Sequence, residues 1–279
     1  MDKLKLMKTA NEIRKGIVTS VHSAKAGHPG GSLSAAEIFT YLYFEELNVD
    51  PEDPKKPDRD RFVLSKGHTA PGLYAALAEK GFFPKEDLVT LRHTGSYLQG
   101  HPDMKCIPGV DMSSGSLGQG VSAAVGMALA AKLSGDDYRV YTLLGDGEIQ
   151  EGQVWEAAML AAHRKLDNFV LIVDNNNLQI DGRVDEVNSP YPIDKKFEAF
   201  NFHVINVADG NDMDQLRAAF DEAKTVKGKP VAIIAKTVKG KGVSFMENQA
   251  SWHGTAPNDE QYAVAMADLE KVGEALCQK

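Results

Sequence analysis

The sequence predicts an α/β fold built on a doubly wound parallel sheet flanked by helices. From about residue 139 onward, short apolar runs alternate with helical stretches. Parallel strands need crossover connections, and helices bury both faces of such a sheet, so this alternation favours a parallel sheet. The chain has 279 residues, of which 43% are hydrophobic and 25% charged, as is ordinary for a folded protein.

Five apolar runs are the expected strands of this sheet. The runs are short and rich in Val, Ile, Leu and aromatic residues, which is typical of strands buried on both faces. They lie at residues 61–65, 139–144, 169–173, 202–207 and 230–236.

Helices are expected between these strands and through most of the first 135 residues. Near the N-terminus, Leu6, Ala10, Ile13 and Ile17 recur at helical spacing. Gly and Pro residues delimit several of the other segments. The other expected helices lie at residues 71–81, 84–93, 153–164, 195–200 and 213–226.

A segment rich in Pro and charged residues, at 48–60, is the linker candidate of this sequence. Apolar segments resume directly on both sides of it, so it is expected to be a surface loop. Residues 1–279 are therefore expected to form a single domain.

Charge and composition argue against several classes of protein. Lysine and arginine number 31 against 39 acidic residues, and the net charge of −8 gives no bulk attraction to nucleic acid or to anionic membranes. The longest weakly polar run, residues 121–131, is shorter than the roughly 20 residues of a membrane-spanning helix. The N-terminal segment lacks a signal-peptide core, so a cytoplasmic location is expected. Cys106 and Cys277 have no spacing that indicates a disulfide framework or a zinc site.

Two polar residues follow consecutive expected strands. Asp146, within Gly-Asp-Gly, follows the strand at 139–144, and Asn176 follows the strand at 169–173. A helix crosses over between the two strands. Both side chains are therefore expected beyond the carboxyl ends of neighbouring parallel strands, where open sheets bind their ligands.

The side-chain oxygens of Asp146 and Asn176 suit a small hard cation such as Mg²⁺ or Ca²⁺. A single carboxylate leaves the ion with surplus positive charge, which the oxygens of a diphosphate would balance. Gly145 and Gly147 let the backbone approach a phosphate closely, and a helix starting near Ile149 would add N-terminal amides. The pattern therefore predicts a diphosphate held through a metal ion.

A simpler interpretation is that Gly-Asp-Gly forms a tight turn and that the asparagines tolerate left-handed backbone in a loop. An EF-hand does not fit, because Leu178 and Gln179 stand where an oxygen ligand and a glycine are required. The sequence contains no GxxxxGK[ST] pattern, which argues against a P-loop nucleotide site.

Gly-Asp-Gly followed by 27 residues (148–174) and then Asn175-Asn176 resembles the signature of thiamine diphosphate enzymes. Further motifs resemble the N-terminal half of transketolases. They are AKAGHPGGSLSAAEI (24–38), DRDRFVLSKGH (58–68), QGHPD (99–103), SSGSLGQGVSAAVGMA (113–128), KTVKGKG (236–242) and WHGTAP (252–257). The resemblance implies a thiamine diphosphate-binding fold of the diphosphate-binding type.

The resemblance also implies which residues bind the cofactor and its metal. Asp146, Asn176 and the carbonyl group of Leu178 would bind the metal ion, and Gly147 would contact the diphosphate. The family usually has Gly-Pro-Leu where this chain has Ser116 in the middle position. The residues implied in cofactor binding are His68, Gly115, Leu117, Gly147, Asn176, Ile180 and His253.

Four histidines, His28, His68, His101 and His253, lie beside Gly or Pro in expected loops. One such histidine would be interpreted as structural, but four in polar loops favour a shared pocket, because imidazole can donate to phosphate or to sugar hydroxyls. The resemblance implies catalytic roles for His28, His101 and His253, which would face the sugar. It implies that His68 and His253 touch the cofactor.

Glu151 and Glu156 match acidic residues that, in transketolases, lie near the subunit interface and connect two active sites. The resemblance therefore implies a catalytic role for Glu151. Both residues also fit as ordinary charges in the first turns of a helix. The small residues at 122–133 are compatible with a dimer interface and equally with a buried core helix.

Transketolases transfer a two-carbon ketol unit from a ketose phosphate to an aldose phosphate, in the pentose phosphate pathway. The acid that activates the aminopyrimidine lies in a second, pyrimidine-binding domain, and the sequence ends before such a domain could begin. A split enzyme is therefore expected, in which the C-terminal subunit is separately encoded. Self-association into a dimer of pairs, a heterotetramer, is also expected.

Other interpretations stay open. Another thiamine diphosphate enzyme, such as a 1-deoxyxylulose-5-phosphate synthase or a ketolase for an unusual sugar phosphate, would share these motifs. A nicotinamide-dependent dehydrogenase would use GQGVSA (118–123), although the residues before it are not an apolar strand. A non-catalytic regulatory protein is a third alternative.

Overall fold

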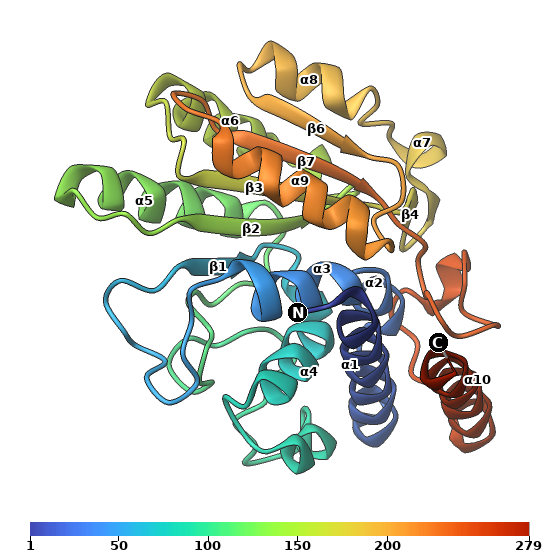
Figure 1. Ribbon diagram of the computed structural model, residues 1–279. Coiled ribbons are helices and arrows are strands. Elements are labelled where there is room, and N and C mark those ends of the chain that lie inside the picture. The colour runs from blue at the N-terminus through green and yellow to red at the C-terminus, as the bar shows by residue number, and fades with distance from the viewer. Residues whose placement is uncertain (279) are drawn as a thin grey trace.

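The computed structural model describes residues 1–278, and over this range it contains a five-stranded parallel sheet with the order β1-β2-β3-β7-β6 (Figure 1). The five strands are β1 (Arg61–Leu64), β2 (Val140–Gly145), β3 (Phe169–Asn175), β6 (His203–Val207) and β7 (Val231–Lys236). Each coincides with an expected apolar run, so the predicted parallel sheet is confirmed. A short antiparallel hairpin, β4 (Leu178–Gln179) and β5 (Gly182–Arg183), follows β3.

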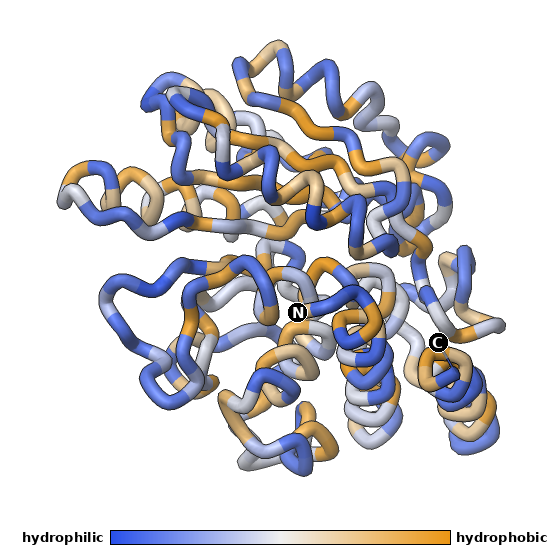
Figure 2. Tube along the Cα trace, in the orientation of Figure 1, coloured by the Kyte–Doolittle hydropathy of each residue, from blue (hydrophilic) through white to orange (hydrophobic). Residues whose placement is uncertain are grey.

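Helices cover both faces of the sheet, as expected. One face packs against α5 (Gln119–Ser134), α6 (Gly152–His163) and α8 (Ile193–Ala199). The helices on the other face are α1 (Lys3–Ala24), α3 (Ala36–Tyr41), α4 (Ala70–Lys80) and α9 (Met213–Thr225). Successive residues of a strand point to opposite faces, and the buried apolar residues of the strands therefore contribute to one core on each side of the sheet. Figure 2 shows that hydrophobic residues predominate along the central strands.

The remaining helical segments are shorter or lie at the end of the chain. Helix α10 opens with an Asn258 capping box and packs against α1, so that the first and last helices of the chain lie side by side. These segments are α2 (Pro29–Ser34), α7 (Val184–Val187), α10 (Asp259–Cys277), a π turn at Leu42–Glu46, and 3₁₀ turns at Gly67–Thr69, Lys85–Thr90, Glu148–Gln150 and Ala250–Trp252.

Two expected helices differ from the structure in helix type or in starting residue. The segment at 84–93 forms a 3₁₀ turn rather than an α-helix, because Leu91 is extended and Arg92 is left-handed, with φ 59°. The helix expected to start near Ile149 begins at Gly152 instead. Glu151 has an extended backbone, with ψ 130°, and this separates a single 3₁₀ turn from the helix.

The order of the strands reverses between β3 and β7. The chain advances through β1, β2 and β3 to the edge strand β6 and then returns through α9 to insert β7. The connections that leave β3 and β7 therefore diverge, and such a reversal of strand order opens a ligand crevice at the carboxyl ends of the strands. Over residues 1–278, no helix is long and apolar enough to cross a membrane.

Candidate functional site

A cavity of about 370 Å³ lies beyond the carboxyl ends of β2 and β3. Its wall also includes the loops that follow β1 and β7 and the β4–β5 hairpin. Ten of the residues predicted from the sequence line it: His68, Gly115, Leu117, Asp146, Gly147, Glu151, Asn176, Leu178, Ile180 and His253. His28 and His101 lie just behind this lining.

Asp146 reaches the cavity because β2 ends at the residue before it. The side chain is almost fully buried, with 2% of the residue exposed. Its carboxylate accepts the backbone N–H of Gly147 at 2.9 Å and that of Asn177. Burial and the nearby charge of Asp174 raise the pKa of Asp146 well above its ordinary value. Among residues 1–278 it has no ion-pair partner, so the site favours an added cation.

The run of three asparagines shapes the opposite wall. Asn175 accepts a hydrogen bond from the Tyr191 hydroxyl at 2.6 Å. Asn176 donates to Asp174 and accepts the Leu178 N–H, both at 3.1 Å. Asn177 is left-handed, with φ 59°, and donates its N–H to Asp146. Specific hydrogen bonds therefore fix this loop to Tyr191, Asp174 and Asp146. The simpler interpretation, in which the asparagines only tolerate left-handed backbone, does not require these contacts.

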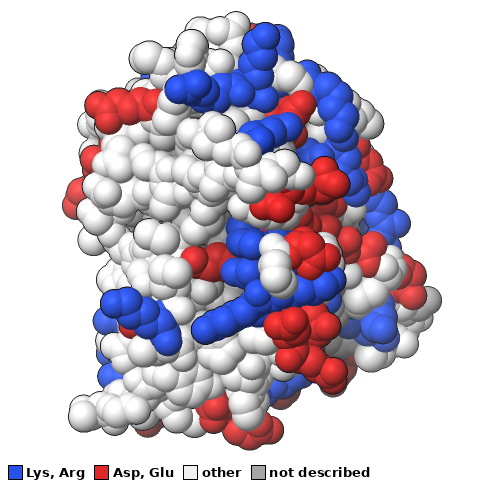
Figure 3. Space-filling model, turned by 90° about the vertical axis from the view of Figure 1, so that its left-hand side faces the viewer, with Lys and Arg blue, Asp and Glu red and all other residues white. Residues whose placement is uncertain are grey.

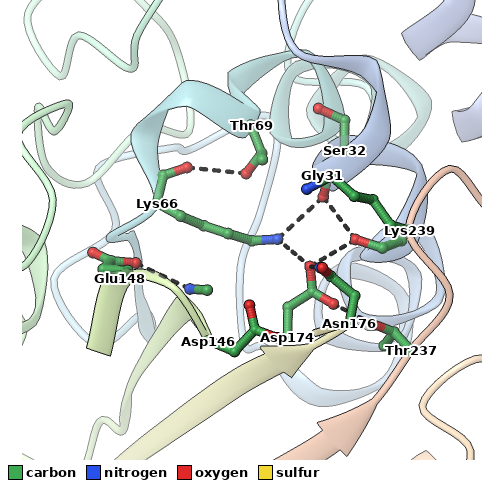
Figure 4. A network of polar contacts seen from close by, with 12 residues as sticks. Gly31, Ser32, Lys66, Thr69, Asp146, Glu148, Asp174, Asn176, Thr237 and Lys239 are labelled. Atoms are coloured by element: carbon green, nitrogen blue, oxygen red, sulfur yellow. Dashed lines mark hydrogen bonds and ion pairs between the residues drawn. The ribbon is translucent and has the colours of Figure 1, made fainter. Parts of the chain in front are cut away.

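A buried ion pair lies beneath the cavity. The Lys66 ammonium contacts the Asp174 carboxylate and donates to the Gly31 carbonyl at 3.1 Å (Figure 4). Ser34, at 2.6 Å, and Thr237 also donate to Asp174. Although burial opposes ionisation of Asp174, Lys66 and these donors hold its pKa below the usual value. Asp174 is therefore a fixed anion that orients Lys66 and Asn176.

Lys239 is the second buried cation of the site, with 2% of the residue exposed. Its ammonium donates to the Leu178 carbonyl at 3.0 Å and lies 3.1 Å from His253 Nδ1. Burial lowers the pKa of Lys239, against the attraction of Asp174 and Asp146. Two lysines beside one cavity make this end of the cavity suited to an anion.

The donor set fits a small divalent cation. Asp146, Asn176 and Leu178 supply a carboxylate, an amide oxygen and a backbone carbonyl, and a carbonyl that accepts one hydrogen bond retains a second lone pair. No group of three or more His, Cys, Asp or Glu side chains within residues 1–278 forms a separate metal site. A cation at this cavity would therefore depend on this mixed oxygen set.

Three of the four predicted histidines form one cluster. The His68 ring centroid is 5.1 Å from those of His28 and His253, and the latter two are 5.5 Å apart. His101 lies against Gly115 of the cavity wall, because a Cβ added at Gly115 would be 3.2 Å from its ring. The expectation that all four share one region is therefore met.

The clustered imidazoles are held neutral. Burial, with the charge of Arg92 as the next cause, lowers the pKa of His28 to about 4. Burial and Lys239 lower that of His253 to about 3. The pKa of the buried His68 is lowered as well, mainly by desolvation. His28 Nδ1 is buried without a hydrogen-bond partner among the described residues, which leaves it free for a ligand.

The mouth of the cavity is apolar and exposed. Ile180, on the turn between β4 and β5, is 66% exposed, and Leu117 is 38% exposed. Glu151 lines the cavity at the start of α6, while Glu156 is exposed on the outer side of that helix.

Close backbone approaches explain two of the glycines. A Cβ at Gly147 would lie 3.2 Å from Gln179 Cβ, and one at Gly67 would lie 2.8 Å from the Gly115 nitrogen. Ser116 stands where the family usually has proline, and its two neighbours, Gly115 and Leu117, still line the cavity as expected.

Sequence reasoning missed the buried charges of the site. Lys66, Asp174, Lys239 and Glu148 all line the cavity, and both lysines lie inside motifs that carry the family resemblance. A signal exists in the sequence, because Lys66 and Lys239 are each followed directly by a glycine, in SKGH and VKGKG, and a lysine is unusual in a segment that must pack closely. The dinucleotide interpretation of 118–123 fails, since no strand precedes it directly.

Comparison with known proteins identifies this architecture as a thiamine diphosphate-binding domain. The family model described as "Transketolase, thiamine diphosphate binding domain" matches residues 6–270. A solved transketolase from Campylobacter jejuni superposes on 99% of this chain with a TM-score of 0.90 and 34% identity, and the match covers 46% of that chain.

Two relatives are transketolase subunits of similar length. The chain is 46% identical over 268 residues to a 6-deoxy-6-sulfo-D-fructose transketolase subunit of Clostridium sp. (strain MSTE9), which covers 96% of this chain and 97% of that protein. It is 44% identical to an apulose-4-phosphate transketolase subunit of Actinobacillus succinogenes, over 95% and 96% of the two chains. The human transketolase is 46% identical over 90% of this chain, but only 40% of its own length is matched. The chain therefore belongs to the transketolase family and corresponds to its N-terminal part, which confirms the resemblance seen in the sequence.

Proposed function

We propose that this chain is the N-terminal subunit of a split transketolase, which transfers a two-carbon ketol unit between sugar phosphates together with a separate C-terminal subunit. The observation that supports this most strongly is the convergence of Asp146, Asn176 and Leu178 with two buried lysines and the histidine cluster around one cavity. The matching length of the two subunit relatives supports the division into subunits.

In this proposal the carboxyl end of β2 and β3 holds the diphosphate of the cofactor. Asp146, Asn176 and the Leu178 carbonyl bind Mg²⁺ or Ca²⁺, and Gly147 contacts a phosphate. Lys66 and Lys239 balance the negative charge that remains. Thiamine diphosphate, when bound, supplies the electron sink for cleavage of the carbon–carbon bond.

The histidines act on the sugar. Because burial keeps His28 neutral, one of its nitrogens can accept a hydroxyl proton and the other can donate a hydrogen bond. His253 is also neutral, but its Nδ1 faces the Lys239 ammonium, which can only donate, so Nε2 carries the hydrogen and can donate to a sugar hydroxyl. His101 is placed beside them to orient the substrate, and His68 borders the cofactor. Glu151, which lines the cavity at the start of α6, is proposed to link the site to a neighbouring subunit.

The substrates are proposed to be a ketose phosphate donor and an aldose phosphate acceptor, as in the pentose phosphate pathway. The two subunit relatives are named for a sulfonated fructose and for apulose 4-phosphate. A ketolase for an unusual sugar with a terminal anionic group is therefore the second candidate. Donor and acceptor assays on the reconstituted pair distinguish the two.

The assembly is proposed to be a dimer of pairs located in the cytoplasm, with residues 1–279 as one domain. The α5–α6 face is the exposed outer surface of these helices, and it is the proposed contact between copies. Figure 3, seen from the side where α5 ends, shows a broad area without charged side chains. The face comprises Gly126, Ala130, Leu133, Met159 and Leu160.

Purified chain tested with and without its partner subunit checks the proposal. The chain alone should transfer no glycolaldehyde units from a ketose phosphate at an enzymatic rate, and addition of the partner should restore transfer. Transfer by the chain alone would refute the split arrangement. Failure of the pair to require thiamine diphosphate would refute the cofactor assignment.

A further inference from the structure

Glu148 is a buried acid whose side chain is not one of the ligands or bases of the proposed reaction. It is the residue after Gly147, and only 3% of it is exposed. One carboxylate oxygen accepts the Ser65 hydroxyl at 2.6 Å and the Gly118 N–H at 2.9 Å. The other accepts the Gly145 N–H at 3.1 Å. Both oxygens are therefore engaged by donors from three separate segments.

These three segments all lead directly into the cavity wall. Ser65 precedes Lys66 at the end of β1, Gly118 follows Leu117 before α5, and Gly145 precedes Asp146 at the end of β2. Figure 4 shows Glu148 on the same side of the site as Lys66 and Asp146, and Glu148 itself lies in the 3₁₀ turn that follows β2. A single carboxylate thus joins the segments that carry a buried cation, an apolar wall residue and a metal ligand.

The contact network extends into the helix that follows. The Ser65 hydroxyl oxygen also accepts the N–H of Val121, in the first turn of α5, at 3.2 Å. Burial raises the pKa of Glu148, while Ser65 and the backbone amides favour its ionised form. A buried carboxylate is costly unless it is hydrogen-bonded, and here three donors meet that requirement.

We propose that Glu148 is a positioning residue that fixes the diphosphate-and-metal end of the cavity by joining the loops of β1, β2 and α5. This role rests on the proposed cofactor site. Removal of the carboxylate would delete the one side chain that contacts all three of the loops carrying Lys66, Leu117 and Asp146. Misplacement of catalytic-site groups by a fraction of an ångström weakens binding and rate.

A carboxylate is required in preference to an amide of the same shape. All three partners donate, and two of them share one oxygen. If Glu148→Gln keeps its oxygen at the shared position, its NH₂ group faces the Gly145 N–H, and two donors oppose each other. The substitution should therefore lower the affinity for the cofactor although it changes neither the side-chain volume nor the proposed ligands of the metal.

The test is calorimetric titration of thiamine diphosphate with Mg²⁺ into the full chain with its partner subunit, at a temperature well below unfolding. Loss of a hydrogen bond to a charged group predicts an affinity about tenfold lower or more for Glu148→Gln. Glu12→Gln is the matched control, because Glu12 lies on the outer side of α1 with 49% of its side chain exposed. Its affinity should equal that of the wild type.

Ser65→Ala provides an independent probe that leaves the charge in place. It should weaken cofactor binding, and its effect should not add to that of Glu148→Gln, because both remove the same contact. If Glu148→Gln does not fold, the cofactor affinity of Ser65→Ala alone tests the proposal. A Ser65→Ala variant that binds the cofactor as tightly as the wild type would then overturn it.

Two further results would contradict it. If Glu148→Gln had a lower unfolding temperature but unchanged cofactor affinity, Glu148 would be a structural residue only. If the losses of affinity in Glu148→Gln and Ser65→Ala were fully additive in the double variant, the two residues would not act through one contact. If the wild-type pair bound no thiamine diphosphate, the proposed function would fail together with this role. Normal wild-type binding with unaffected variants would overturn the role of Glu148 alone.

Discussion

The neutral state of the histidine cluster has a cost that depends on pH. In the folded chain the pKa of His28 is about 4 and that of His253 about 3, whereas an unfolded chain has histidine pKa values near 6.5. Below pH 6.5 these two histidines bind protons in the unfolded state but stay neutral in the folded state. Stability should therefore be retained above pH 6.5 and fall as the pH decreases toward 4.

Replacement of His28 by Gln should reduce this acid sensitivity. The variant should lose less unfolding free energy than the wild type between pH 7 and pH 5, by on the order of 1 kcal/mol once partial exposure is allowed for. Urea unfolding at the two pH values measures the difference. Equal losses in both proteins would show that His28 is not held neutral by its surroundings.

At the scale of single residues, the sequence predicted the groups whose position follows from the chain itself. Asp146 and Asn176 each follow a strand end, and parallel strands bring such ends together. The buried charges could not be placed in this way. Lys66 meets Asp174 more than 100 residues away in the chain, and Glu148 meets Ser65 across 83 residues. Such pairs depend on the register of β1, β2 and β3, which no local pattern encodes.

At the scale of elements, the strands were predictable because a strand buried on both faces is apolar throughout. Val140 and Leu144 pack into one core while Tyr141 and Leu143 pack into the other. The start of α6 was not predictable from spacing. Glu148 directs its side chain inward to backbone amides, and Glu151 is extended, so the helix begins at Gly152 and not near Ile149, although the helical pattern at 153–164 matches α6 closely.

Helix α5 offers a matched pair of glycines for testing its packing. A Cβ at Gly120 would lie 2.7 Å from Ser65 Cα, whereas nothing lies within 4 Å of one at Gly126. Gly120→Ala should push α5 from β1 and destabilise the chain by about 1–3 kcal/mol. Gly126→Ala should stabilise it by up to about 1 kcal/mol through helix propensity.

Chemical denaturation of the two variants at low protein concentration measures both effects. Low concentration keeps the comparison independent of contacts between copies on the outer side of α5. Equal stability of the two variants would contradict the close approach of α5 to the end of β1.

At the scale of the whole molecule, the α5–α6 face should mediate self-association. Leu133 is 80% exposed and Met159 62% exposed, on helices that carry few outward charges. Leu133→Lys should weaken self-association at least about tenfold, because it buries an ammonium group in an apolar contact. Val264→Lys, at a 50% exposed site on α10, is the control and should leave assembly unchanged. Sedimentation analysis in which both variants behave like the wild type would place the contact elsewhere.

In the proposed split enzyme, the position of the cavity indicates which part of the cofactor each of the two subunits would contact. The chain supplies the groups that suit a metal and a diphosphate, and its exposed Leu117 and Ile180 lie at the mouth. The pyrimidine end of the cofactor would then meet the partner protein at these apolar residues. The sequence predicted this division through the family motifs, whereas the fold alone would allow many ligands at the same crevice.

The decisive experiment measures the affinity of the reconstituted pair for thiamine diphosphate with Mg²⁺ in the Asp146→Asn variant. The substitution keeps size and removes the only carboxylate among the three proposed ligands, so affinity should fall at least about 100-fold. Asp181→Asn, on the exposed turn of the β4–β5 hairpin, should bind like the wild type. Wild-type affinity in Asp146→Asn, or binding that does not depend on Mg²⁺, would contradict the proposed metal and diphosphate site.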